Sequence, residues 1–168
     1  MLVFDFHFEN IILFLMGLLN TVFGILIFFK KGEKLKANEA FIWLSFTIAL
    51  WAWLLASARS ATDTQTALWA SRILYAIATF LPYWFLRFAI LFLAPRERNI
   101  VALAVPTIIF AFVALFTDLI IADVGKQAMR TIFIFGPWYI GFVAYLTIYF
   151  LIGLFIIARR YLHASLGS

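Results

Sequence analysis

Five long apolar segments constrain this chain more than any other feature. About 20 apolar residues in a helix cross a bilayer hydrocarbon core of about 30 Å, and each segment has about this length. Each is also too long for a buried strand, and the alternating pattern of a membrane β-barrel is absent. The sequence therefore predicts an all-α fold, a five-transmembrane-helix bundle that forms one membrane-embedded domain over residues 1–168, with helices at about 10–29, 37–58, 67–94, 100–121 and 135–158.

Composition agrees with a membrane protein and excludes other classes. The chain is 66% hydrophobic and 12% charged, whereas soluble domains are about half apolar and a quarter charged. It has no cysteine, which excludes disulfides, thiolate metal sites and a cysteine nucleophile. The net charge of +5 comes from basic residues that lie mostly in short loops, so we expect the lipid bilayer, and no nucleic acid, as a partner.

Basic residues in short loops also predict the orientation, because cytoplasmic loops carry an excess of lysine and arginine. If the five segments alternate, one side receives only Arg59, Lys126 and Arg130, among several acidic residues. We therefore predict that the amino terminus is outside and the carboxyl terminus is cytoplasmic. The cytoplasmic side then carries Lys30, Lys31, Lys34, Lys36, Arg96, Arg98, Arg159 and Arg160.

The polar residues give little support for catalysis or for a cofactor. The two histidines, His7 and His163, lie outside the apolar segments, which excludes a haem held between facing helices. Every lysine lies in a loop, so a retinal Schiff base is excluded too. All acidic residues lie at or beyond the ends of segments, whereas proton-coupled carriers usually place one inside the membrane. We expect no catalytic residue, metal site or cofactor.

The third segment is unusual because it carries two arginines and a proline. A charge in hydrocarbon costs at least about 2.5 kcal/mol unless it faces protein or reaches the interface. Arg72 therefore either extends to the headgroups, anchors an anionic ligand, or pairs with Asp118 or Asp63; for Arg87 we expect headgroup contact. Pro82 should kink the helix.

These residues lead to a prediction about ligand binding and one about packing. We expect a pocket between the first, third and fifth helices that opens toward the outer leaflet and binds a small apolar or anionic ligand. Its expected lining is Arg72, Tyr75, Trp138 and Tyr139. Asn20 and Gly24 lie a turn apart on one face of the first helix, where a small residue permits close approach and an amide bonds across the interface. Together with Pro82, they are the expected helix-packing residues.

An ordered set of short motifs resembles a known family. The set runs from Asn20-x-x-x-Gly24 through Asn38, Phe41, Ala49-Leu50-Trp51, Trp69-x-x-Arg72-x-x-Tyr75, Leu81-Pro82 and Gly136-Pro137-Trp138-Tyr139 to Arg159-Arg160-Tyr161. It is similar to the amino-terminal seven-transmembrane sensor region of bacterial histidine kinases and related diguanylate cyclases, and it covers nearly the whole chain.

This resemblance implies a multi-pass sensor or receptor module in a bacterial inner membrane, which is not itself an enzyme and which feeds a cytoplasmic output domain. This sequence differs from the family pattern in two ways. It predicts five helices where the family region has seven, and it ends at Ser168 without a kinase or cyclase domain. The alternative is a stand-alone small integral membrane protein: a carrier, a channel-forming oligomer or a complex subunit. A homodimer fits both interpretations.

Overall fold

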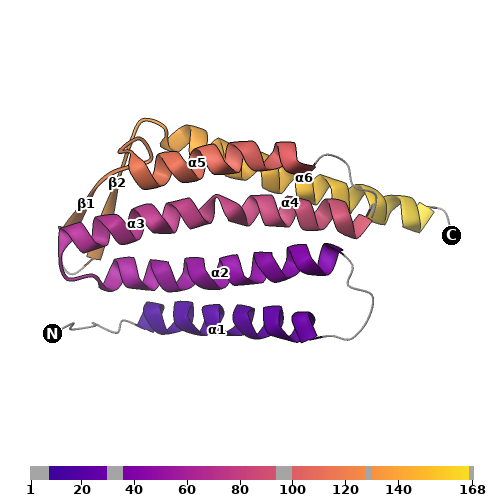
Figure 1. The fold of residues 1–168 in the computed structure, drawn as a ribbon, viewed down its shortest axis with the longest axis horizontal. Coiled ribbons are helices and arrows are strands. Elements are labelled where there is room, and N and C mark those ends of the chain that lie inside the picture. Colours follow the sequence, from indigo (N-terminus) through magenta and orange to yellow (C-terminus); the bar gives the residue numbers. More distant parts are fainter. Residues whose placement is uncertain (1–7, 30–35, 94–99, 128–129, 167–168) are drawn as a thin grey trace.

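The computed structural model describes residues 8–29, 36–93, 100–127 and 130–166, which form a layered bundle of helices with a small hairpin at one end (Figure 1). α1 packs on α2, α2 packs on both α3 and α4, α3 packs on α5, and α4 packs on α6. The elements are α1 (Phe8–Phe29), α2 (Lys36–Ser60), α3 (Thr64–Ala78), α4 (Phe80–Leu93), the 3₁₀ helix η1 (Ile100–Leu103), α5 (Ala104–Phe116), β1 (Ile121–Gln127), β2 (Arg130–Phe135) and α6 (Tyr139–Leu166).

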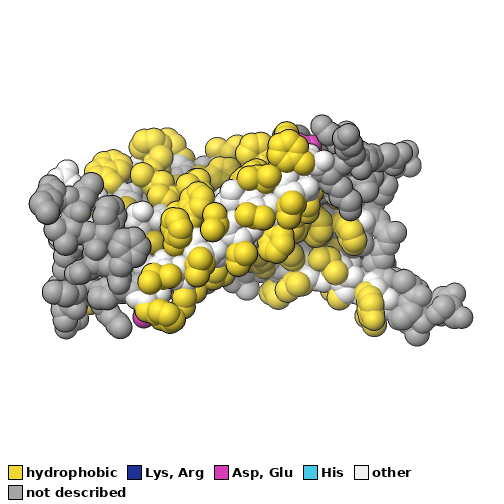
Figure 2. All heavy atoms as spheres, turned by 90° about the horizontal axis from the view of Figure 1, so that it is seen from below, with side chains coloured by type: hydrophobic (Ala, Val, Ile, Leu, Met, Phe, Trp, Pro, Cys, Tyr) yellow, Lys and Arg dark blue, Asp and Glu magenta, His cyan; other side chains and the backbone are white. Residues whose placement is uncertain are grey.

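Within the described residues, four helical spans are long and apolar enough to cross a membrane: Phe8–Phe29, Lys36–Ser60, Thr64–Phe92 and Tyr139–Arg159. α5 is also apolar, but at 13 residues it is shorter. Hydrophobic side chains cover much of the face on the α1 side (Figure 2), as expected of a surface in contact with lipid. The predicted helical membrane bundle is thus confirmed.

The predicted third helix is one long span that breaks at Thr79. The break separates α3 from α4, and it lies one turn before Pro82, which has no backbone N–H to donate to the preceding turn. The Thr79 hydroxyl donates to the carbonyl of Ala76 at 2.7 Å. Both Thr79 and Pro82 are buried in the bundle, so the irregular backbone lies among protein atoms rather than in lipid.

Between α5 and α6, the structure forms a β-hairpin where the sequence predicts only a loop with room for structure of its own. β1 and β2 pair antiparallel, with Val124 opposite Phe133 and an irregularity between Ile121 and Asp123. β1 packs on α3, and the hydroxyl of Thr131 donates to the carbonyl of Ala58 at 3.2 Å. The last helix consequently begins at Tyr139 rather than at Phe135.

The contact between α1 and α2 depends on two glycines of α1. A Cβ atom at Gly17 would overlap the indole ring of Trp53, and one at Gly24 would lie 3.4 Å from the ring of Phe46. The expected bond of Asn20 across the interface is not formed, because its amide donates to the carbonyl of Met16 in the same helix at 2.9 Å. A helix carbonyl one turn away is the partner that this amide finds without help from a second helix.

Candidate functional site

Arg72 of α3 is a largely buried cation at the hairpin end of the bundle. Its guanidinium forms an ion pair with the carboxylate of Asp118, which lies just beyond α5. The Arg72 side chain is 12% exposed, whereas that of Asp118 is 74% exposed. The guanidinium also lies over the ring of Trp69, 5.7 Å from the ring centroid. Its Nε is buried and has no hydrogen-bond partner, so this cation has spare donor capacity.

A close backbone approach at Gly136 holds the turn that carries Asp118. A Cβ atom at Gly136 would overlap the backbone of Asp118 and Leu119. The N–H of Gly136 donates to the carbonyl of Ile120 at 3.0 Å, and that of Trp138 donates to the carbonyl of Leu119 at 2.8 Å. Glycine is therefore the residue that permits this contact, and the motif at 136–139 positions the partner of Arg72.

Tyr75, one turn after Arg72, is the centre of an aromatic cluster beneath the hairpin. The centroid of its ring lies 5.6 Å from that of Phe142, 6.1 Å from that of Phe133 and 6.4 Å from that of Tyr139. Tyr139 also stacks on Phe135, with centroids 3.8 Å apart. Such tilted and offset ring pairs are favourable beyond the apolar area that they bury. The cluster connects α3, β2 and α6.

The break at Thr79 is bonded to α6 by a buried tyrosine. The hydroxyl of Tyr145 donates to the carbonyl of Thr79 at 2.8 Å and lies 2.7 Å from the hydroxyl of Thr107 in α5. One turn later on α6, the hydroxyl of Tyr149 donates to the carbonyl of Leu103 at 2.9 Å, where η1 meets α5. Two tyrosines on one face of α6 therefore satisfy backbone groups at two irregular points.

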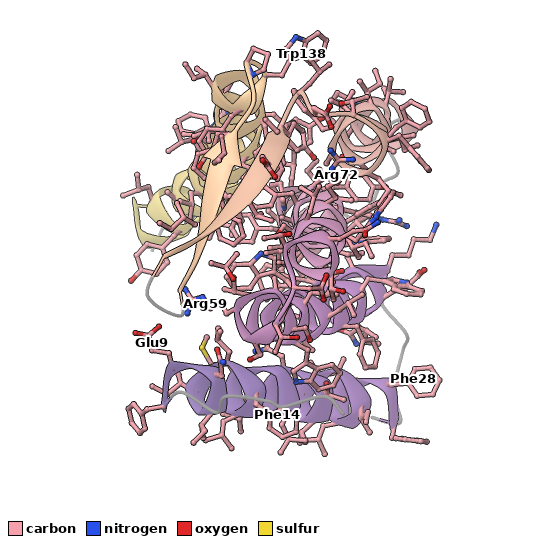
Figure 3. The ribbon with its side chains drawn as sticks, turned by 90° about the vertical axis from the view of Figure 1, so that its left-hand side faces the viewer. Glu9, Phe14, Phe28, Arg59, Arg72 and Trp138 are labelled. Atoms are coloured by element: carbon pink, nitrogen blue, oxygen red, sulfur yellow. The ribbon has the colours of Figure 1, made fainter. Side chains whose placement is uncertain are left out.

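The structure brings together only part of the predicted ligand site. Tyr75 and Tyr139 are in ring contact, and Arg72 lies one helical turn before Tyr75. Trp138 points outward, away from Arg72 (Figure 3), and is half exposed. The pocket was predicted between the first, third and fifth helices, but the first helix cannot line it. α1 packs on α2, and α2 separates α1 from α3 and α6 (Figure 1).

Sequence reasoning missed the residues that connect the site to α6. A tyrosine such as Tyr145, within an apolar helix, has the same pattern as an interfacial or packing aromatic, and its partner Thr79 is 66 residues away. The hairpin did have a signal. Residues 131–135 read Thr-Ile-Phe-Ile-Phe, and β-branched and aromatic residues favour strands.

Comparison with known proteins gives one match. The family described as the N-terminal 7TM region of histidine kinase matches residues 12–166. The match includes most of α1, the broken helix, the hairpin and all of α6. No curated protein and no solved structure matches the chain.

Proposed function

The chain belongs to the family of amino-terminal seven-transmembrane regions of histidine kinases, and on this premise we propose that it is the signal-input module of a two-component system in the inner membrane of a bacterium. The family region is the sensor part of such kinases and is not their catalytic part. We propose that a stimulus is received at the hairpin end and passed along α6 toward an output domain on the cytoplasmic side.

One observation carries the proposal: the candidate receiving site and the contacts of α6 are built on the same broken helix. Arg72, which belongs to α3, pairs with Asp118. The hydroxyl of Tyr145 in α6 donates to the carbonyl of Thr79, at the break that ends α3. A change at Arg72 that moves α3 would therefore alter the contact of α6 at Thr79. Signalling requires an element that connects the two sites and that has two arrangements with different affinities for the ligand. The broken helix is that element in our proposal.

The chemistry of Arg72 favours a small ligand with an anionic group and an apolar body. The anionic group would compete with Asp118, whose side chain is exposed to solvent. A planar guanidinium binds carboxylate or phosphate through two parallel hydrogen bonds. The ring cluster around Tyr75 would contact the apolar part. Displacement of Asp118 would separate its carboxylate from Arg72, while the backbone contacts of Gly136 and Trp138 keep the turn in place.

The test joins residues 1–168 to a histidine kinase output domain and measures autophosphorylation in membrane vesicles. Asp118→Asn removes the charge partner and should mimic ligand binding, so we expect the ligand-free rate to change by about two- to fivefold. Arg72→Ala should abolish the response to stimulus. Arg72→Lys should lose much of it too, because lysine lacks the planar fork.

Arg59→Gln is the matched control, because Arg59 also pairs with an acid, Glu9, at the same end of the bundle (Figure 3). This pair joins α2 to α1, and neither helix is part of the broken helix. We expect Arg59→Gln to leave output unchanged. Equal output from wild type, Asp118→Asn and Arg72→Lys would leave Arg72 as an interfacial anchor and contradict the proposal.

A further inference from the structure

The broken helix carries the same short pattern near each of its ends. Trp69-x-x-Arg72 lies in α3, and Trp84-x-x-Arg87 lies in α4. At this spacing both side chains lie on one helical face. In each case the guanidinium lies over the tryptophan ring, 5.7 Å from the centroid for Arg72 and 5.2 Å for Arg87. In each case the Nε is also buried and has no hydrogen-bond partner.

The two arginines differ in the charge that faces them. Arg72 pairs with Asp118, whereas Arg87 forms no salt bridge with any acid in the described part of the chain. Glu39, the acid in the first turn of the neighbouring helix α2, is exposed and forms no salt bridge with Arg87. Arg87 as a residue is partly exposed, so its side chain is only partly covered by protein.

The depth of Arg87 places its guanidinium near the phosphate layer. Arg87 follows Arg72 by 15 residues, which is about 22 Å along a helix. If the two arginines lie symmetrically in a hydrocarbon core about 30 Å thick, each is a few Å inside its boundary. From that depth, a side chain as long as arginine reaches the headgroups. A cation without an acidic partner at this level can bind a headgroup anion.

The surface beside Arg87 is a stacked pair of indoles that faces lipid. Trp84 stacks on Trp43 of α2, with ring centroids 5.8 Å apart and planes at 16°. Trp43 is 49% exposed. Indoles favour the membrane–water interface, where an apolar body meets a polar layer. The guanidinium therefore lies over an indole that is itself stacked on a second indole, which limits the positions that the cation can take before any ligand arrives.

We propose that Arg87, Trp84 and Trp43 form a binding site for the phosphate of an anionic phospholipid, at the end of the bundle opposite the hairpin. The ligand chemistry is a phosphodiester anion, and the lipid is its source because the rings beside the cation face the acyl chains. An anionic lipid is preferred over a zwitterionic one because the latter carries its own cation, which competes for the phosphate. This site is independent of the proposed stimulus at Arg72.

The test is native mass spectrometry of residues 1–168 released from detergent with equimolar phosphatidylglycerol and phosphatidylcholine. We expect wild-type protein to retain phosphatidylglycerol preferentially, and Arg87→Gln to reduce that retention about tenfold. Arg87→Lys should retain an intermediate amount, since it keeps the charge and loses the fork. Glu39→Gln is the matched control at the same end of the bundle and should retain at least as much as wild type.

Three results would overturn the proposal. Equal retention of the two lipids by wild-type protein would overturn it. This result needs no variant, so it does not depend on whether Arg87→Gln folds. Unchanged retention by a folded Arg87→Gln protein would show that the lipid binds elsewhere. Displacement of phosphatidylglycerol by millimolar inorganic phosphate would show that the site takes free phosphate instead of lipid.

Discussion

At the scale of single residues, two glycines set close contacts that the sequence alone did not reveal. Gly136 was notable as part of a motif, but its role depends on the backbone of Asp118 and Leu119, which folding brings against it. Gly17 likewise matters because the indole of Trp53 covers it. The pairing of Arg72 with Asp118 was one of several predicted alternatives, since two acids were candidates and no spacing chose between them.

Gly136→Ala should disrupt the site through the backbone. The added methyl group overlaps the turn at Asp118, so the turn must shift, and we expect a loss of about 1 to 3 kcal/mol in the free energy of unfolding. Gly125→Ala in the same hairpin is the control, because a Cβ atom there meets nothing within 4 Å. Denaturant titration in detergent measures both, and equal stability of the two variants would refute the close-approach argument.

Gly17→Ala tests the packing of α1 on α2. The methyl group would displace the indole of Trp53, whose N–H donates to the carbonyl of Phe14 at 3.4 Å. We expect a loss of about 1 to 3 kcal/mol. At Gly141, where a Cβ atom meets nothing within 4 Å, the same substitution should be neutral or slightly stabilising, because alanine favours helix. If Gly17→Ala unfolds at the wild-type temperature, α1 does not pack tightly here.

At the scale of elements, the errors lie where two structures compete. The predicted fourth helix at about 100–121 is too long, because its α-helical part is Ala104–Phe116 and Ile121 begins β1. The kink at Pro82 follows from the chemistry of proline, and the structure places the break at Thr79. The start of the last helix was set too early because Phe135 continues an apolar run, although that residue ends β2. The role of Tyr145 could not be predicted, because its partners belong to other helices.

Tyr145→Phe should destabilise the junction of α3, α4, α5 and α6. It leaves the carbonyl of Thr79 and the hydroxyl of Thr107 without their present partner. We expect a cost of about 1 kcal/mol, since hydrogen bonds inside membrane bundles are worth about that much. Tyr139→Phe is the control, because Tyr139 contributes ring stacking on Phe135, which phenylalanine preserves. Equal thermal stability of the two variants in detergent would contradict the bonded junction.

At the scale of the whole molecule, the described residues contain four spans that meet the length expected for a membrane helix, where the sequence predicts five, and α5 is a shorter apolar helix beside them. α5 ends at Phe116, two residues before Asp118, the partner of Arg72. It begins at Ala104, next to Leu103, whose carbonyl accepts a hydrogen bond from Tyr149 in the middle of the span Tyr139–Arg159. α1 begins at the hairpin end, and α6 ends at the opposite end (Figure 1).

The predicted orientation, with the hairpin end outside, remains to be measured. The basic loop residues favour it. A cysteine at Asp63, which is exposed before α3, should react with an impermeant maleimide added to intact cells. A cysteine at Lys36, exposed at the start of α2, should react only after the cells are opened. The reverse pattern of labelling would invert the topology.

The central claim is that the state of the Arg72–Asp118 pair reaches α6 through the bond between Tyr145 and Thr79. The most direct test is autophosphorylation of a kinase domain joined after α6, compared for Asp118→Asn with and without Tyr145→Phe. We predict that Asp118→Asn changes the rate by about two- to fivefold and that Tyr145→Phe removes most of this change. If the rate change persists in full in a folded double variant, coupling does not pass through Tyr145.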